Sequence, residues 1–318
     1  MKSGSITTVT GQIASADLGP TLAHEHLWCD ISLHSGREDN LLNDVSLMAQ
    51  ELEFFRTVGG QAIIEMTCEG IGRDPAKLKA ISQASGVKII GGIAFYAEST
   101  LPRWIREASV EQIADYFVGA IEGGQGGARA GLIGELMSHN EASPDPTGYQ
   151  LSAIETRIFQ AAARAQRQTG VAISTHASLG RGGHAQLTVL EQGGADPRKI
   201  AIGHCDAHWH ADPERDLPYY LFILERGAYC AFDMIGWNDL APDQIRAERI
   251  ARLIQLGYER QLLLSTDTCR QSQLRRNGGR GFDYLWTSFL PRLRRLGVSD
   301  LQIHSMLVEA PATLLSRD

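Results

Sequence analysis

The chain has 318 residues, of which 43% are hydrophobic and 21% charged, a composition typical of a folded globular protein rather than a disordered or fibrous one. Its 30 Lys and Arg against 37 Asp and Glu give a net charge of −7, which argues against nucleic acid or an anionic membrane as partner. Five scattered cysteines without a C-x-x-C pair predict reduced thiols. Because we find neither a signal-peptide pattern nor an apolar run near ~20 residues, we expect a cytoplasmic protein.

Short apolar runs alternate with longer segments at helical spacing along most of the chain. Ahead of them, Ser5–Ala14 alternates like a small hairpin. The runs that predict buried parallel strands are Thr21–Trp28, Ala62–Cys68, Lys88–Tyr96, Gly131–Met137, Val171–Ser178, Ile200–Asp206, Ala228–Gly236 and Leu262–Thr268. The predicted helices are Val45–Val58, Pro75–Ala84, Val110–Ile121, Gln150–Gln168, His184–Glu191, Pro213–Arg226, Pro242–Leu256 and Phe282–Leu296, with a last, capping helix over Leu301–Leu315.

A strand followed by a helix, eight times over, predicts an α/β fold of the (β/α)8 TIM barrel type, with a short N-terminal β-hairpin and a C-terminal capping helix. An open doubly wound sheet is the main alternative, and the lack of a G-x-G-x-x-G turn counts against it. No linker or low-complexity segment interrupts the pattern. We therefore expect residues 1–318 to form a single barrel domain.

Ionisable side chains stand at the ends of several predicted strands, where apolar residues would be expected. They are His24, His26, Glu135, His176, His204 and Asp267. Side chains two residues apart on a strand share a face, so His24 and His26 point together. The carboxyl ends of barrel strands converge on one mouth, where these enzymes keep their active sites. A lone buried His or Asp is usually an ordinary core residue, but buried ionisable groups in this number need partners or a metal.

Six nitrogen and oxygen ligands exceed what one four-coordinate ion needs and suit two ions that share a bridging carboxylate and a bridging hydroxide. Because no thiolate is among the ligands, zinc, manganese, cobalt or iron would all fit, and zinc is the leading expectation. The sequence therefore predicts two divalent metal ions as cofactors of a hydrolytic enzyme.

The segments that carry this pattern resemble the phosphotriesterase family of the amidohydrolase superfamily. They are TLAHEHLWCD (21–30), AGLIGELM (130–137), VAISTHAS (171–178), IAIGHCD (200–206), LLLSTDTCR (262–270) and the tail over 290–315. The resemblance implies that His24, His26 and Asp267 hold the more buried metal, that His176 and His204 hold the second, and that residue 135 bridges both. It also implies a homodimer.

Glu135 departs from the best-known members of that family, which bridge their metals with a carboxylated lysine. Some branches use glutamate there, so the departure leaves a binuclear site intact. It weakens the transfer of phosphotriester hydrolysis to this chain.

In the expected mechanism, the two ions lower the pKa of a bridging water, and the resulting hydroxide attacks the substrate carbonyl. Asp267 is the predicted catalytic residue, because it would accept the proton of that hydroxide and pass it to the leaving group. The absence of a G-x-S-x-G motif disfavours a serine hydrolase.

Residues that follow the predicted strands are candidates for substrate binding. Tyr96 follows the third strand and Trp237 the seventh, and either could line the pocket or pack in a loop. Arg270, Arg275 and Arg276 follow the eighth strand, ahead of a glycine-rich segment, where barrels often bind phosphate. We therefore expect a phosphate or carboxylate group on the substrate, with a solvated basic loop as the alternative.

Three residues at or just beyond the end of the sixth predicted strand each allow two interpretations of their role. Asp206 could orient a metal ligand or stabilise a turn. His208 and His210 repeat the H-x-H spacing and could contact substrate or lie in a solvated loop.

The function expected from these residues and the resemblance is metal-dependent hydrolysis of a carboxylic ester, with a lactone, such as an anionic sugar lactone, as leading substrate. Phosphotriester hydrolysis and N-acyl amide hydrolysis are the alternatives, because the same centre could perform them and fold does not fix function. A single-metal deaminase would not need Glu135 as a bridge. A non-catalytic binding protein would be expected to have lost a ligand, and all six are present.

Overall fold

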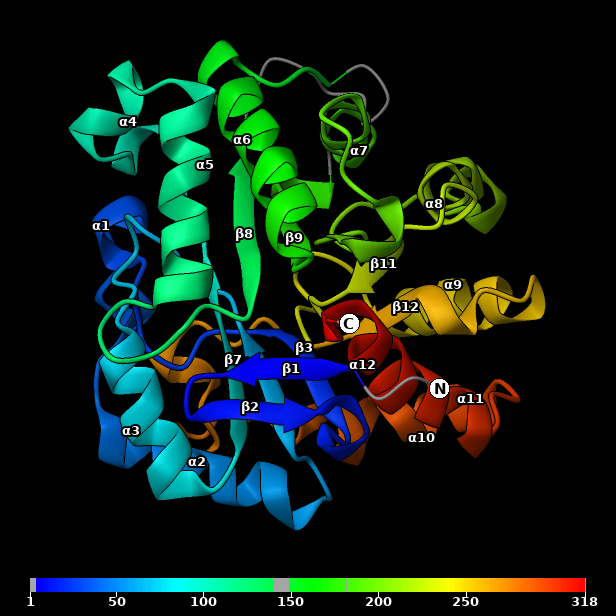
Figure 1. Cartoon of the computed structure of the whole chain (residues 1–318). Helices are drawn as coiled ribbons and strands as arrows, with labels where there is room; N and C mark the ends of the chain where they lie inside the picture. The colour runs from blue at the N-terminus through cyan, green and yellow to red at the C-terminus, as the bar shows by residue number, and fades with distance from the viewer. Residues whose placement is uncertain (1–3, 140–148, 181, 318) are drawn as a thin grey trace.

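The computed structural model describes residues 4–139, 149–180 and 182–317. Among these residues, eight parallel strands form the centre of the molecule (Figure 1). They are β3 (Thr21–Glu25), β6 (Ala62–Glu65), β7 (Lys88–Ile93), β8 (Leu132–Ser138), β9 (Ala172–Ala177), β10 (Ile200–Ile202), β11 (Tyr229–Phe232) and β12 (Leu262–Leu264). Each strand pairs with the next barrel strand along the chain.

The first and last strands meet just beyond the end of β12. The N–H of Asp267 donates to the carbonyl of His24 at 3.2 Å, and the N–H of His26 donates to the carbonyl of Thr268 at 3.2 Å. These bonds close the sheet into a ring, so the predicted (β/α)8 TIM barrel is confirmed.

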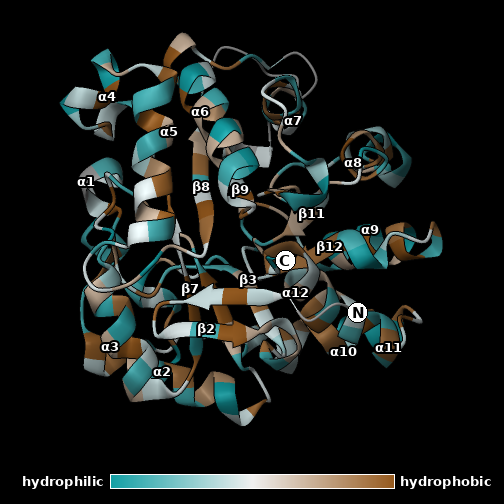
Figure 2. Ribbon diagram, viewed as in Figure 1, coloured by the Kyte–Doolittle hydropathy of each residue, from teal (hydrophilic) through white to brown (hydrophobic). Residues whose placement is uncertain are grey.

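Helices cover the outside of the barrel between successive strands. The longer ones are α2 (Val45–Thr57), α3 (Pro75–Ser85), α5 (Val110–Val118), α6 (Ala153–Thr169), α7 (Gly183–Gln192), α8 (Leu217–Leu224), α9 (Asp243–Gln255) and α10 (Leu290–Arg295). Short helices α1 (Ser32–Ser35) and α4 (Arg103–Glu107) lie in the loops after β3 and β7. Figure 2 shows apolar strands surrounded by helices of mixed hydropathy, as expected for a core between sheet and helices.

Local sequence explains where the helices begin and end. Asp74 accepts the N–H groups of Ala76 and Lys77 at the start of α3, and Pro75 occupies its first position, where no N–H is needed. At the start of α6, Ser152 and Glu155 form a reciprocal capping box.

In the described part of the chain, three predicted helices contain a wider π turn, and the one over Gly119–Gly123 ends the helix that begins with α5. The other two π turns lie near the end of the chain. Leu285–Phe289 precedes α10, and Ser305–Glu309 joins α11 (Asp300–His304) to α12 (Ala310–Leu315), so the capping helix runs from 300 to 315. Pro291 and Pro311 follow these turns as second residues of α10 and α12. Proline cannot donate the usual helical hydrogen bond, and the wider turn accommodates the missing N–H.

The amino end of the barrel is packed closed. The predicted hairpin is present as antiparallel β1 (Ser5–Thr8) and β2 (Gly11–Ala14), and Ser5 pairs with Arg317, so the two ends of the chain lie together in Figure 1. Ile6 of β1 and Leu314 of α12 join the apolar cluster that fills the barrel interior. The carboxyl end, flanked by the small ribbon of β4 (Cys29–Asp30) and β5 (Leu41–Leu42), is left for a site.

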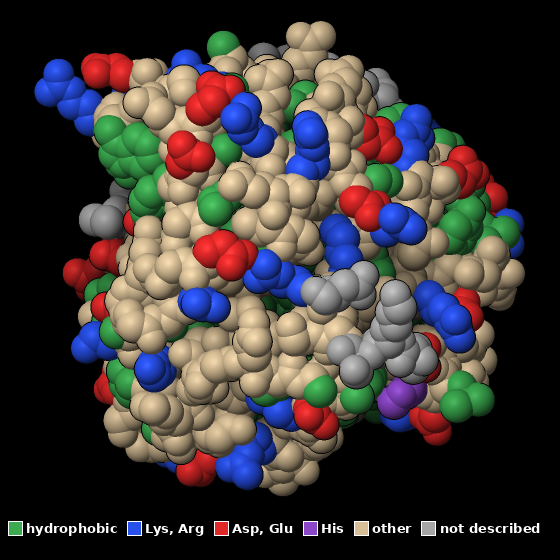
Figure 3. Space-filling view, viewed as in Figure 1, with side chains coloured by type: hydrophobic (Ala, Val, Ile, Leu, Met, Phe, Trp, Pro, Cys, Tyr) green, Lys and Arg blue, Asp and Glu red, His purple; other side chains and the backbone are tan. Residues whose placement is uncertain are grey.

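The surface adds little to this picture. On the face shown in Figure 3, basic and acidic side chains are interspersed, with no large area of one sign. Among the described residues, no helix has both the length and the apolar character that crossing a membrane requires.

Candidate metal centre

Two barrel strands are irregular where predicted ligands stand. The pairing of β3 with β6 shifts register between Leu22 and Glu25, and that of β8 with β9 shifts between Ile133 and Leu136. Ile133 and Leu136 both pack in the outer core, although regular alternation would put them on opposite faces. Such irregularities re-aim side chains near active sites, and here Glu135 contacts the histidines at the barrel mouth.

Two other predicted ligands have left-handed backbone. His204 (φ 54°) and Asp267 (φ 46°) follow β10 and β12, and positive φ is uncommon for residues other than glycine. Hydrogen bonds hold both: Asp233 accepts the N–H of His204 at 2.9 Å, and the carbonyl of His24 accepts that of Asp267. Strained backbone of this kind concentrates at functional sites, because the surrounding structure must hold it in place.

His24, His26 and Asp267 form one group of potential ligands, all buried. The Nε2 atoms of His24 and His26 lie 3.7 and 3.4 Å from Oδ1 of Asp267. With metal–ligand bonds of about 2.1 Å, tetrahedral ligand atoms stand about 3.4 Å apart. The three atoms therefore have the spacing of ligands that share one ion.

Glu135, His176 and His204 form a second group. Nδ1 of His176 lies 2.8 Å from Oε2 of Glu135 and 3.1 Å from Nε2 of His204. Glu135 also reaches the first group, with its oxygens 3.3 Å from Nε2 of His24 and 3.6 Å from Nε2 of His26. The structure thus brings all six predicted ligands together, with Glu135 in contact with both groups.

The charges of this cluster call for cations. Glu135, Asp233 and Asp267 are buried, and within the described part of the chain they form ion pairs only with imidazoles. Buried carboxylates need compensating charge. Nε2 of His24 is also buried and makes no hydrogen bond to any described residue. Divalent ions would supply both the charge and the missing partner, so the residues fit a metal centre.

The buried carboxylates and imidazoles of the cluster shift one another's pKa values. Burial opposes the charged imidazole of His204, but the carboxylate of Asp233 raises its pKa to about 9. Burial likewise opposes ionisation of Glu135, yet His176 and His24 hold its pKa well below its usual value. The raised pKa of His204 and the lowered pKa of Glu135 both mean that the buried carboxylates favour positive charge beside them.

Thr67 and Glu65 fix the tautomer of His26. The hydroxyl of Thr67 donates to Glu65 at 2.6 Å, so the contact of 2.9 Å between Thr67 Oγ1 and His26 Nδ1 must have the imidazole as donor. The proton then sits on Nδ1, and Nε2 is left bare toward the ligand groups. Such outer hydrogen bonds orient metal-binding histidines.

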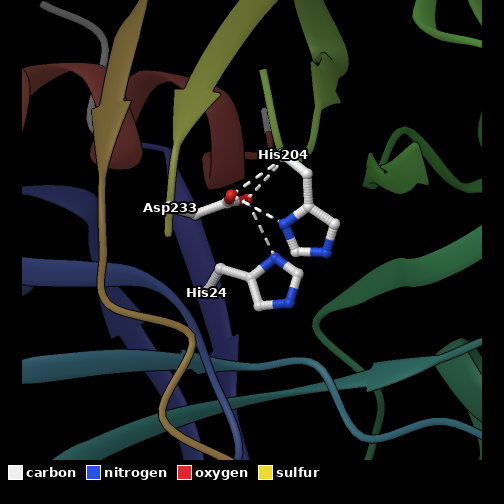
Figure 4. Close-up of side chains that lie close together, drawn as sticks. All are labelled: His24, His204 and Asp233. Carbon is white, nitrogen blue, oxygen red and sulfur yellow. Dashed lines mark hydrogen bonds and ion pairs between the residues drawn. The ribbon is translucent and has the colours of Figure 1, made fainter. Parts of the chain in front are cut away.

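Asp233, directly after β11, is a central residue that the sequence analysis missed. It is completely buried, 2.8 Å from Nδ1 of His204 and 3.1 Å from Nδ1 of His24 (Figure 4). Tyr229 and Ala231 of the same strand face the barrel interior, and Asp233 continues their alternation. A lone acid in phase with the inward residues of an apolar run was the pattern that could have revealed it.

Asp206 acts on this arrangement from one step further out. It accepts the N–H groups of Asp233 and Met234 and pairs with Nε of the buried Arg246 at 2.7 Å. Burial raises its pKa to about 6, and Arg246 opposes that rise. Asp206 therefore holds Asp233, which in turn contacts His204, whereas the sequence had left open whether it orients a metal ligand or stabilises a turn.

A cavity of about 360 Å³ opens beside the ligands. Its lining includes Glu135, His176 and Asp267 together with three of the predicted substrate-binding residues, Tyr96, Trp237 and Arg270. The ring of Tyr96 lies 5.5 Å from that of His176, and the guanidinium of Arg270 lies 4.4 Å from the ring of Trp237. The remaining lining residues are His26, Ile31, His34, Ser35, Arg37, Asn40 and Cys269.

The other residues that the sequence suggested for substrate binding lie outside the lining of this cavity. The guanidinium groups of Arg275 and Arg276 pack over Phe54 of α2, and Arg275 pairs with Asp283. Neither arginine lines the cavity, because the chain turns away after Arg270. His208 and His210 also lie outside its lining, and Nδ1 of His210 is 2.5 Å from Asp216.

Several known proteins are similar to this chain along nearly its whole length. The model of the phosphotriesterase family matches residues 4–315. The phosphotriesterase homology protein of Escherichia coli is 34% identical over 297 residues, which cover 92% of this chain and 97% of that protein. The N-acetyltaurine hydrolase of Pongo abelii is 28% identical, over 99% of this chain and 98% of its own length.

Solved structures give the same result. The crystal structure of the E. coli protein, complexed with phosphate in its active site, has a TM-score of 0.86 at 33% identity and covers 94% of this chain and 99% of that one. A mutant of the PTE-like lactonase of Deinococcus radiodurans has a TM-score of 0.84 at 30% identity and covers 98% of this chain and 100% of its own.

Proposed function

We propose that this chain, which belongs to the phosphotriesterase family, hydrolyses a carboxylic ester, with a lactone as the leading substrate class, at a centre of two divalent metal ions. The observation that carries the proposal is the pair of ligand groups joined by Glu135 on the wall of the mouth cavity. The likeness to a lactonase and the small volume of the cavity support the substrate class.

In this proposal His24, His26 and Asp267 would hold one ion, His176 and His204 would hold the other, and Glu135, which contacts both groups, would be shared between them. When bound, two divalent ions supply Lewis-acid polarisation of a carbonyl and lower the pKa of water. Zinc is the metal we propose, and the same nitrogen and oxygen donors would accept manganese, cobalt or iron.

Asp267 is the proposed catalytic residue. It lines the cavity, and its Oδ1 atom lies beside the two histidines of its group. We assign proton transfer from the attacking water to the leaving group to its other oxygen, Oδ2. General acid–base transfer of this kind contributes roughly 10²–10⁴-fold to a rate.

Arg270 is proposed to bind an anionic group of the substrate. It forms no ion pair with a carboxylate of the described residues, and its Nε atom is buried without a hydrogen-bond partner there. Contact with the Trp237 ring fixes the guanidinium beside the cavity. A phosphate or carboxylate on the substrate would complete these contacts.

A second candidate function is the hydrolysis of an N-acyl amide whose amine part carries an anion. The N-acetyltaurine hydrolases, similar along nearly the whole chain, favour it. Arg270 would then bind the acid group of the amine. Phosphotriester hydrolysis is left as a side activity of the same centre.

The test combines metal content with a substrate screen. Purified protein is expected to bind two metals per chain and to hydrolyse lactones, sugar lactones with an anionic group above all, until a chelator removes the metal. Turnover of N-acyl amides alone would support the second candidate. A chain that binds no metal after reconstitution would contradict both.

Cellular location and assembly are smaller parts of the proposal. The five cysteines are buried free thiols, which suits the reducing cytoplasm. A homodimer is proposed from the family alone.

A further inference from the structure

We infer that Asp233 is a positioning residue that couples the two metal sites, because its one carboxylate sets the tautomer of a histidine in each ligand group. The inference rests on the two-metal centre proposed above. It assigns to Asp233 a role in determining how many ions the chain binds.

The contacts of Asp233 divide between the two groups. Its Oδ1 atom lies 2.8 Å from Nδ1 of His204, which belongs to the group with Glu135. Its Oδ2 atom lies 3.1 Å from Nδ1 of His24, which belongs to the group with Asp267. Nδ1 of His24 has no well-aligned hydrogen-bond partner among the described residues, and Oδ2 of Asp233, at 3.1 Å, is the acceptor that lies beside it.

The chemistry of these contacts leaves one arrangement for metal binding. A neutral imidazole carries one N–H, and an ionised carboxylate only accepts hydrogen bonds. Both histidines therefore place their hydrogen on Nδ1, toward Asp233. Their Nε2 atoms, which face Glu135 and His176, are left bare to bind an ion.

The backbone around Asp233 keeps this arrangement in one place. The N–H of His204 donates to Oδ1 at 2.9 Å, and Asp206 accepts the N–H of Asp233 at 3.2 Å. Asp206 is itself bound to the buried Arg246. The carboxylate of Asp233 is thus fixed at both its side chain and its backbone.

Replacing Asp233 by asparagine is expected to affect the two metal sites differently. The backbone N–H of His204 can only donate, and it lies closer to Oδ1 (2.9 Å) than to Oδ2 (3.2 Å), so the single amide oxygen of Asn is expected at the place of Oδ1. The amide NH2 then occupies the place of Oδ2 and donates to Nδ1 of His24. His24 must carry its own hydrogen on Nε2, and this atom can no longer bind an ion.

The experiment measures zinc binding to chelated wild-type protein, Asp233→Asn and Asp216→Asn, by metal analysis and calorimetric titration. Asp216 is the matched control, because it is also buried and accepts hydrogen bonds from the backbone N–H and the Nδ1 atom of one histidine, His210. His210 belongs to neither ligand group. The wild type is expected to bind two zinc ions. Asp233→Asn should bind one tightly and the other about 100-fold more weakly. Asp216→Asn should bind two with wild-type affinities, even if it melts earlier.

Asp233→Ala provides a second variant should Asp233→Asn fail to fold. Alanine removes the acceptor without forcing a donor on His24, so both sites should remain but weaken by roughly 10-fold. Two wild-type affinities in either Asp233 variant would overturn the inference and leave the two-metal centre standing. A wild type that binds fewer than two ions would overturn both.

Discussion

Each histidine of the centre whose Nδ1 points outward has a partner that decides which nitrogen stays bare. Asp233 serves His24 and His204, and Thr67 serves His26. Each partner lies just beyond the carboxyl end of another barrel strand, Thr67 after β6 and Asp233 after β11, so the tautomers depend on how the strands pack. At the scale of single residues, the metal-binding character of an imidazole is set by a neighbour that would never touch the ion.

Thr67→Val tests this at His26. Valine has nearly the same shape but no oxygen, so the N–H of His26 loses its acceptor and the imidazole is free to turn or change tautomer. We expect zinc affinity to fall by about 10–100-fold while the fold is kept. Competition with a coloured chelator measures the affinity, and circular dichroism checks the fold. Unchanged affinity would contradict the role given to Thr67.

Arg270→Met tests the anion site. The variant keeps most of the side-chain volume beside Trp237 but removes the charge. We expect KM for an anionic lactone to rise by about 10-fold or more, because a charge-assisted hydrogen bond is lost, while a neutral lactone is unaffected. Arg198→Met, an exposed arginine ahead of β10, is the control. Equal effects of Arg270→Met on both substrates would count against the site.

At the scale of elements, helix α9 holds the loop that follows β10. Arg246 pairs with Asp206 and Arg249 with Asp216, and all four side chains are buried. One helix therefore clamps both ends of the segment between His204 and the start of α8. Because Asp206 in turn holds Asp233, the position of α9 is transmitted to the metal centre.

Arg246→Met should destabilise the protein by about 3–5 kcal/mol, because it leaves the carboxylate of Asp206 buried without its cation. Adding Asp206→Asn removes that unpaired charge, so the double variant should recover part of the loss. Urea unfolding of the metal-free proteins gives the free energies. A double variant less stable than Arg246→Met would argue that the pair acts independently of charge.

At the scale of the whole molecule, the metal centre lies on the seam where the barrel closes. His24 and His26 come from β3, and Asp267 follows β12. Glu25, between the two histidines, accepts from Ser265 and from Thr266 and Thr268 across the same seam. An ion bound by the first ligand group would therefore join the first strand of the barrel to the last.

Metal removal should loosen this seam before the rest of the barrel. At free metal 100-fold above Kd, each bound ion adds about 2.7 kcal/mol to folding, so chelation should lower Tm by several degrees. Hydrogen exchange should increase most at the amides of Thr266 and Asp267, which bond across the seam. Amides of β7, a barrel strand that carries no proposed metal ligand, serve as the internal control. A uniform increase would contradict the local effect.

The sequence by itself determined that the chain forms a barrel and that the predicted ligand residues meet at one end of it. Strand and helix spacings are local, and caps such as Asp74 and Ser152 mark helix ends without reference to the rest of the chain. Because the carboxyl ends of barrel strands converge on one mouth, the fold also brings ligands from five strands into one place. That rule alone was enough to predict that these six side chains lie together.

Only the tertiary structure decided which atoms face which. The irregular pairing near Glu135 has no local sequence pattern, and neither does the left-handed backbone at His204. Asp233 gained its two histidines because it follows β11, which pairs with β10, and contacts both His204 after β10 and His24 of β3, which is not a neighbour of β11 in the sheet. Arg275 follows Arg270 by five residues, yet it packs on α2 and misses the cavity. Contacts of this kind join residues far apart in the chain, so their geometry exists only once the barrel has closed.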